Sequence, residues 1–267
     1  MSISDLNFAH LSCAEFKRQL IEIVDELDLI TLQVRLVRTK NETDFSPNDI
    51  RRTTYSKLEP ILSFSKISLY HIHNDLLDDN YWAKMYRNND DLDDEIRKMA
   101  LLSYYKVAKN AFVISLFASL EHMLRAVFKE RNEKKYEKIK NIVSLCEQFL
   151  KEFGVLEFGP LRRGAEIHKN QNAIEFIRLL SLLRNLQHNT GVYAPLRSGE
   201  PPQKIIHCGR EYDFIEGVVP KYGGWFDNCR YMEDALVFID TLIDATLRLD
   251  MKKQIVDPTY NEMATTP

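Results

Sequence analysis

The chain has 267 residues, of which 45% are hydrophobic and 28% charged, a balance typical of a globular protein that buries a substantial core. Its formal net charge of -3 excludes non-selective nucleic-acid binding driven by overall charge, and leaves only a local basic patch for that role. No run of 18 uninterrupted apolar residues occurs, and no basic segment precedes an apolar run at the start of the sequence. We therefore expect neither a membrane span nor a secretory signal.

The four cysteines are scattered and form no CxxC pair: Cys13, Cys146, Cys208 and Cys229. This pattern argues against a disulfide framework or a cysteine-based zinc site and favours a reducing cytoplasm. Nothing in the sequence resembles a phosphate-binding loop, a dinucleotide-binding fingerprint, an HExxH helix or a GxSxG elbow. We therefore expect no cofactor and no bound metal.

Apolar residues recur at helical spacing over residues 13–37, which predicts an amphipathic helix. The polar segment NETDFSPND (41–49) should break this helix. A second helical pattern runs from about residue 49 to 77, interrupted or entered near Pro60. The acidic stretch RNNDDLDDE (87–95) should be a solvated loop or the capped start of the next helix.

The strongest helical pattern covers residues 95–133. Its middle, AFVISLFASLEHMLRAVF, is apolar on most faces, so this helix should run through the centre of the fold. A shorter helix is predicted over 136–153, followed by the glycine- and proline-containing loop EFGVLEFGPLRRG. A further helix is predicted over 172–188.

The segment KIIHCGREYDFI has two short β-like runs around Gly209, which predicts a small hairpin. The last helical pattern, 226–251, begins on an Asp cap. We therefore predict an all-α helical bundle with a small β-hairpin. It would comprise an N-terminal helical extension (1–95), a helical domain (96–253) and a frayed tail (254–267).

The stretch RNLQHNTG (184–191) places an Arg, an Asn and a His at the end of a helix. Arg184 and His188 are four apart and project to the same side, with Asn185 one step round and Gly191 suited to end the helix. The negative helix end favours a protonated His. Such a group could hold a phosphodiester with Arg and move a proton with His. The alternative is a helix terminus whose Arg and His only complement the dipole.

The segment FIRLLSLLRNLQHNTGVY resembles the signature helix of HEPN domains, the helical domains of many RNA-cleaving toxins and antiviral proteins. NAFVISLFASLEHMLRAVF resembles their first long helix, in which an acidic residue sits mid-helix and Glu121 matches. YMEDALVFIDTLIDATL fits their last helix, and the resemblance covers about residues 97–250.

The resemblance implies a metal-independent endoribonuclease that cuts RNA by attack of the 2'-hydroxyl on the neighbouring phosphate. It implies a homodimer with facing Arg/His motifs, in a toxin or antiphage defence system with an antitoxin or regulatory protein as a possible partner. Arg184 and His188 would be catalytic, Asn185 would orient the site or the substrate, and Glu121 would pair with Arg184 or His188. Three residues separate Arg184 from His188, a shorter interval than the family usually has.

Two alternatives stay open at this point. Some members of the family have lost the motif, so the chain could be a non-catalytic HEPN-like module that binds a protein partner or RNA. It could also be an unrelated helical protein, in which Arg184 and His188 lie apart from any pocket or dimer interface.

Glu121 interrupts an otherwise apolar helix, and a buried carboxylate is costly unless it is paired. Arg184, Arg125 or a histidine could supply the partner. Alternatively, Glu121 lies on a narrow stripe that faces solvent.

Three other segments contain residues that could bind a metal or RNA or act as a nucleophile. His71, His73 and Asp75 suggest metal ligands, although residues two apart on a helix point away from each other, which favours surface or packing roles. The basic segment 125–140 is either an RNA-guiding patch or a solvated helix face with ion pairs between residues four apart. Beside Gly209, the pair His207–Cys208 suggests a reactive thiol, but no base–nucleophile pattern accompanies it.

Overall fold

The computed structural model describes residues 11–86, 94–153, 173–188, 193, 202–207, 209–218, 224–251 and 253–260. It is an all-α fold with one small antiparallel hairpin, as predicted. The elements are α1 (Cys13–Asp44), α2 (Ile50–His71), a π-helical turn (Ile72–Leu76), α3 (Asp79–Met85), α4 (Asp94–Arg131), α5 (Glu133–Tyr136), α6 (Ile142–Phe153), α7 (Ala173–His188), β1 (Gln203–His207), β2 (Arg210–Phe214) and α8 (Trp225–Arg248).

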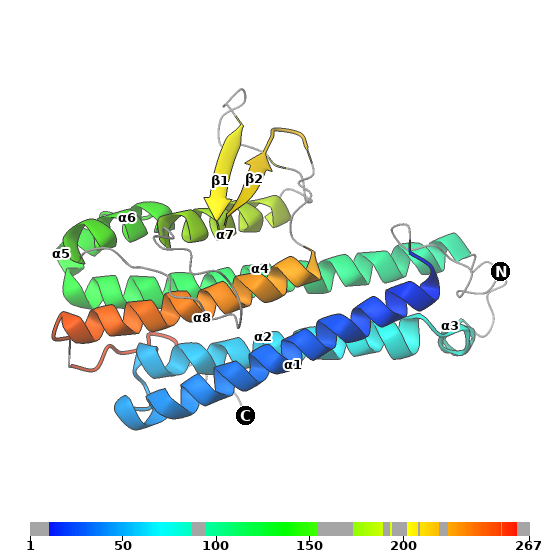
Figure 1. Cartoon of the computed structure of the whole chain (residues 1–267), viewed down its shortest axis with the longest axis horizontal. Coiled ribbons are helices and arrows are strands. Elements are labelled where there is room, and N and C mark those ends of the chain that lie inside the picture. The colour runs from blue at the N-terminus through cyan, green and yellow to red at the C-terminus, as the bar shows by residue number, and fades with distance from the viewer. Residues whose placement is uncertain are drawn as a thin grey trace.

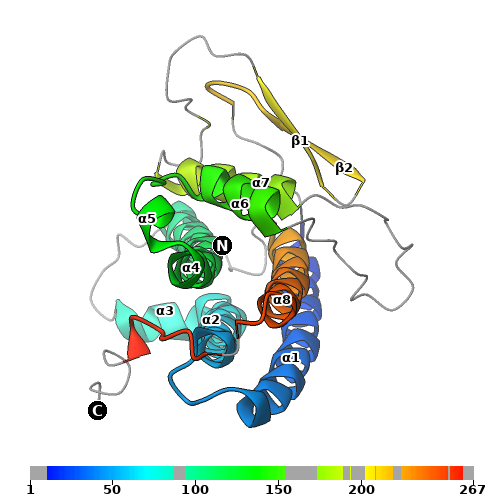
Figure 2. The same ribbon diagram turned by 90° about the vertical axis from the view of Figure 1, so that its left-hand side faces the viewer.

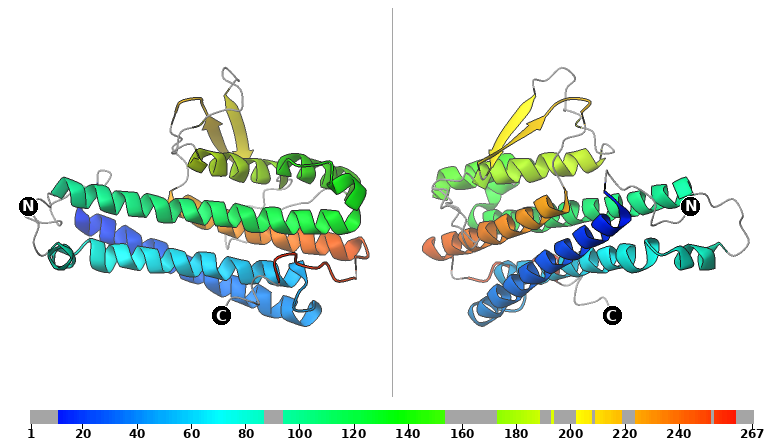
Figure 3. Two further views of the ribbon diagram at one scale, coloured as in Figure 1. Left: turned by 180° about the vertical axis from the view of Figure 1, so that it is seen from behind. Right: turned by 45° about the vertical axis from the view of Figure 1, so that its right-hand side comes forward.

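The helices form three layers. The long helices α4 and α8 lie side by side in the middle, with the α1–α2 pair against one face and the α6–α7 pair against the other (Figure 1). The view along the bundle shows the same order, with the hairpin outside α7 (Figure 2). From behind and from the side, α1 and α2 remain on the outer surface of the bundle (Figure 3). The hairpin and the α1–α2 pair are therefore on opposite sides of the molecule.

One continuous core joins these layers, and it includes side chains from both sides of the predicted boundary at residue 95. The first helical pair thus packs on the rest of the bundle and has no core of its own. By length and composition alone α4 could cross a membrane, but 56% of its most apolar window is buried inside the bundle. A mostly buried core helix is consistent with a soluble protein.

The α1–α2 connection is shorter than the predicted break. Ser12 and Glu15 form a capping box at the start of α1. The helix continues to Asp44, past the predicted end at residue 37, and an Arg38–Glu42 ion pair of 3.2 Å spans its last turns. Only residues 45–49 separate the two helices. The first four residues of the predicted break, 41–44, are polar but include no glycine or proline, and they continue the helix, whereas Pro47 lies in the connection.

Two further predicted boundaries are corrected. The helix expected over 136–153 begins later, at Ile142, because the Asn141 side chain accepts from the N–H of Val143 at 2.9 Å and caps α6, while the short α5 ends at Tyr136. Helix α8 is capped at Gly224, and Asp227, three residues on, accepts from the Gly224 N–H at 3.2 Å.

The hairpin pairs Gln203 with Phe214 and His207 with Arg210, as predicted around Gly209, whose φ of 70° lies in the left-handed region. Both strands alternate, with one face buried toward the helices.

Part of the segment predicted as a frayed tail is packed. Ile255 is 1% exposed and Asp257 2% exposed, and the Asp257 N–H donates to the Asn48 carbonyl at 2.9 Å. Asp49 and Val256 form an isolated bridge. A buried apolar side chain and buried polar partners hold this segment on α2. Residues 261–267 lie outside the described part of the chain.

Candidate functional site

Two ring contacts fix the direction of α7. Near its start, Phe176 packs against Phe238 of α8, with 6.2 Å between ring centroids. Near its end, the guanidinium of Arg184 lies over the ring of Phe117 of α4, 5.2 Å from the centroid. Helix α7 therefore runs opposite to both α4 and α8 (Figure 1).

This direction brings the end of α7 to the start of α8. From Phe176 to His188 the helix rises about 18 Å, and the same length back along α8 from Phe238 reaches Phe226. From Arg184, one more turn of α7 reaches the level of Val113 on α4. Both estimates place the end of α7 at the same level of the bundle.

The start of α8 is held at that level of α4 by aromatic packing. Trp225 contacts Phe112 at a centroid distance of 5.9 Å and Tyr105 at 6.3 Å. The Asn228 amide donates to the Lys109 carbonyl at 3.2 Å. The end of α7, the middle of α4 and the start of α8 thus lie at the same level along the bundle.

The four predicted site residues differ in how far the structure describes their side chains. Arg184 is half-buried against Phe117, and Asn185 is exposed. His188 is the last residue of α7, but its side chain lies outside the described residues, as does Gly191. The pairing of Arg184 with His188 therefore stays a prediction.

Glu121 lies one helical turn after Phe117 on α4, close to the α4–α7 contact. Its Oε1 accepts from Arg125 Nε at 2.9 Å and from Arg125 Nη2 at 2.7 Å. Arg125 also donates to the backbone carbonyls of Ile139 and Lys140. Of the partners considered for Glu121, the structure shows Arg125, and this pair holds the turn before α6 against α4.

Around Asp227, at the start of α8, the structure gathers basic side chains from three elements. Arg210 of β2 approaches its Oδ1 at 3.2 Å and Arg230 at 3.8 Å. Lys109 feels the charge of both Asp227 and Lys106. Lys106, Lys109, Arg210 and Arg230 are here called the cationic cluster. Arg210, Arg230 and Lys109 thus lie around Asp227, with Lys106 close to Lys109, although the whole chain is acidic.

The cationic cluster combines exposure with partial desolvation. The side chains of Arg210 and Arg230 are 48% and 37% exposed, and Lys106 is exposed. Lys109 is half-buried, and burial, followed by the repulsion of Lys106, lowers the pKa of its ammonium despite the attraction of Asp227. An anion arriving at this surface would relieve that repulsion.

Sequence reasoning missed the cationic cluster because its members are far apart along the chain. In the contiguous basic segment 125–140, by contrast, two lysines are paired with glutamates. Lys129 lies 3.8 Å from Glu133, and Lys135 contacts Glu152 of α6. These pairs favour the interpretation of 125–140 as a solvated helix face. The one available signal was the Lys106/Lys109 spacing, which puts both cations on neighbouring turns of one face.

The histidine-rich segment before α3 has a packing role. His71 Nδ1 lies 2.7 Å from Asp75 Oδ2, and its ring makes an edge contact with Tyr104 of α4. His73 Nδ1 lies 2.7 Å from the side-chain oxygen of Asn74. Within the described residues no group of three His, Cys, Asp or Glu side chains could hold a metal ion.

A buried pair that the sequence did not reveal anchors the hairpin. His207 is 2% exposed, and its Nε2 is hydrogen-bonded to Asp234 Oδ2 of α8 at 2.9 Å. Its ring stacks on Phe176 of α7 with 5.1 Å between centroids. The pair thereby holds β1, and with it Arg210, close to α8. Cys208, its predicted companion, lies outside the described residues.

No family model, no curated protein and no solved structure matches this chain. We therefore infer function from the geometry of α4, α7, α8 and the hairpin, and from the resemblance of the sequence to HEPN domains.

Proposed function

We propose that the chain is a metal-independent endoribonuclease that cleaves RNA by attack of the 2'-hydroxyl on the adjacent phosphate. The observation that carries the proposal is that the α7 terminus, which bears the Arg/His motif, lies at the same level of the bundle as the cationic cluster. Phosphate groups are the general ligand of such a surface, and RNA presents them at regular intervals.

Each residue has a role in this proposal. The cationic cluster binds the phosphate backbone on either side of the scissile bond. Arg184 stabilises charge on the reacting phosphate, and His188 transfers the proton. Asn185 orients the substrate from its exposed position. Glu121 acts through Arg125, by fixing the turn that precedes α6 beneath α7.

The biological setting proposed here follows the HEPN resemblance. The protein would act in the cytoplasm within a toxin or antiphage defence system, as a homodimer with facing Arg/His motifs. An antitoxin or another regulatory protein would restrain it.

The decisive experiment is an RNA-cleavage assay in excess EDTA, comparing the wild type with His188→Ala on total RNA and on tRNA. We expect cleavage by the wild type only, with 2',3'-cyclic phosphate ends, and a loss of at least about 100-fold in the variant. Circular dichroism and thermal unfolding would show that His188→Ala keeps the fold. Full activity of a folded His188→Ala protein would overturn the assignment.

A second candidate is a non-catalytic HEPN-like module that binds RNA or a protein partner. It is favoured by the position of Arg184, whose guanidinium is already engaged with the Phe117 ring. Binding of RNA without cleavage by the wild type would support this candidate. A nuclease toxin should also be hard to express as wild type and easy to express as Arg184→Ala, whereas a binding module should show no such difference.

A further inference from the structure

On the side of the bundle opposite α7, the α1–α2 pair exposes six large apolar or aromatic side chains, here called the α1–α2 apolar face. They are Leu29 (59% exposed), Leu32 (56%), Leu36 (64%), Phe64 (49%), Ile67 (66%) and Tyr70 (43%). Several large apolar side chains exposed on one side of an otherwise charged protein indicate an interaction site. The spacing 29, 32, 36 is also the spacing of the apolar seam in a coiled coil.

Ion pairs between α1 and α2 show that both rows of side chains face the same way. Asp28 pairs with Lys66 at 2.8 Å, and Arg35 pairs with Glu59 at 3.9 Å. Leu29 and Leu36 follow the acidic or basic partner on α1 by one residue. Ile67 follows Lys66 in the same way on α2. The ion-paired residues face the neighbouring helix, and the next residue along each helix is rotated from that direction toward solvent. Because the two helices are antiparallel, this rotation turns both rows toward the same outer side.

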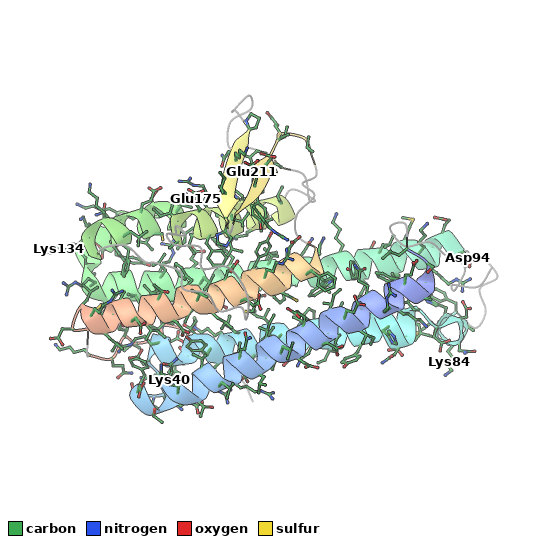
Figure 4. All side chains as sticks on the ribbon, in the orientation of Figure 1. Lys40, Lys84, Asp94, Lys134, Glu175 and Glu211 are labelled. Carbon is green, nitrogen blue, oxygen red and sulfur yellow. The ribbon has the colours of Figure 1, made fainter. Side chains whose placement is uncertain are left out.

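The exposed charges nearest the three leucines on α1 are acidic on one side and basic on the other, whereas Arg18 and Asp44, farther out at the two ends of the helix, have the opposite signs. The exposed acidic residues Glu22, Asp25 and Asp28 precede Leu29. The exposed basic residues Arg35 and Lys40 lie toward the other end, where Lys40 lies near the end of α1 (Figure 4). An antiparallel copy of α1 would therefore bring an acidic segment against a basic segment at both ends of the leucine row.

We propose that the α1–α2 apolar face binds a second copy of the same chain, with the two α1 helices antiparallel and crossing near Leu32. In this arrangement Leu29 faces Leu36 of the second copy, and Asp25 faces Lys40. The interface is isologous, so one set of residues supplies both halves of it. Two α1–α2 pairs then form a four-helix layer that buries the six side chains.

This inference does not rest on the proposed nuclease activity. The interface lies across the bundle from α7, so the two Arg/His motifs would lie at the outer ends of such a dimer. It is therefore distinct from a dimer in which the motifs face each other. Disrupting it should change the assembly and leave the α7 surface unaltered.

The test is the molar mass of the full chain in solution, measured by light scattering or sedimentation equilibrium. We expect the wild type to form at least a dimer of the 31.3 kDa chain, and Leu32→Glu to halve its mass. Met99→Glu is the matched control, because Met99 is a 65% exposed apolar residue on α4, outside this face. A monomeric wild type, an unchanged mass for Leu32→Glu, or the same loss in Met99→Glu would overturn the proposal.

Charge reversal tests the antiparallel orientation. Asp25→Lys and Lys40→Glu should each weaken self-association by about threefold to tenfold, because each places like charges opposite each other twice per dimer. The double variant Asp25→Lys/Lys40→Glu should restore the wild-type dissociation constant. If Asp25→Lys alone strengthened the association, Asp25 would face another acidic residue, and the antiparallel arrangement would be wrong.

Discussion

Two regions of this molecule join basic side chains to carboxylates, and they do so in opposite ways. Where the segment after α8 meets the start of α2, Asp49, Arg51, Lys57 and Asp257 form what is here called the C-terminal lock. There each buried cation has its own carboxylate, and Arg51 and Asp257 are 1% and 2% exposed. In the cationic cluster, Arg210, Arg230 and Lys109 share Asp227, Lys106 lies close to Lys109, and the cations remain partly open to solvent.

Arg51 shows how completely the C-terminal lock is satisfied. Its Nε donates to Asp49 Oδ1 at 2.9 Å, and its Nη2 donates to Asp49 Oδ2 at 2.6 Å. Its remaining N–H groups reach the carbonyls of Met251 at 2.8 Å and Lys253 at 3.0 Å. The guanidinium also lies 4.2 Å from the centroid of the Phe45 ring. No donor of this group is left for a ligand.

The difference teaches how a structural charge is told from a binding charge. A buried charge must be neutralised by the fold itself, since desolvation is expensive. A surplus of one sign at a partly exposed surface is destabilising by itself and is relieved when an anion binds. Both regions contain arginines beside aspartates, so the residue types alone do not separate them.

The largest expected effect is in the C-terminal lock. Arg51→Ala should lower the free energy of unfolding by about 3–5 kcal/mol, because Asp49 is left as an uncompensated buried charge. Urea denaturation followed by circular dichroism measures this loss. Arg35→Ala is the control, since Arg35 is an exposed ion-paired arginine and should cost less than about 1 kcal/mol. Equal losses in the two variants would contradict the distinction.

A smaller, pH-dependent effect is expected at Asp257. Burial raises the pKa of this carboxyl, but hydrogen bonds from Lys57, Thr53 and the Thr259 N–H outweigh burial and leave the pKa below its usual value. Its contribution to stability is thus present above the unfolded pKa of about 4 and is lost as pH falls through the lower folded value.

Asp257→Asn should therefore lower stability at pH 7 by about 2–3 kcal/mol, because Lys57 loses its buried counter-ion. The difference between variant and wild type should narrow below about pH 4. Thermal unfolding across pH 3 to 7 checks both statements. A difference that stayed constant with pH would show that the charge of Asp257 contributes nothing.

Substitutions in the cationic cluster should have the smallest effect on stability and the largest effect on RNA binding. Lys106→Ala/Arg230→Ala should change the free energy of unfolding by less than about 0.5 kcal/mol. It should reduce by about 2 the slope of log affinity for RNA against log salt, roughly one for each lost phosphate contact. Filter binding over a salt series measures that slope.

The matched control removes two lysines from the basic segment 125–140. Lys129→Ala/Lys135→Ala takes the same number of charges from a surface where both lysines are paired with glutamates. We expect it to leave the salt slope unchanged. If the control reduced the slope and the cationic-cluster variant did not, RNA would bind at the α5 end of the bundle.

The sequence was informative where local patterns suffice. Periodicity of apolar residues predicted the long helices and the central position of α4. The two short β-like runs around Gly209 predicted the hairpin. Each of these features depends on side chains close together in the chain. The same periodicity also gave the α7 helix on which Arg184, Asn185 and His188 stand. It did not predict the short helix α3 (Asp79–Met85), and it misplaced three helix boundaries, at Asp44, Asn141 and Gly224.

Only the tertiary structure determines which residues that are far apart in the sequence lie close together in space. Arg210, Asp227 and Lys109 come from a strand and two helices, and no spacing in the sequence connects them. The same holds for Asp257. The sequence around it predicts a frayed tail, but Lys57 and Thr53 of α2 donate hydrogen bonds to its carboxylate, so that it can be buried. Helices form from local hydrogen bonds and side-chain periodicity, whereas charge balance at a site depends on long-range packing.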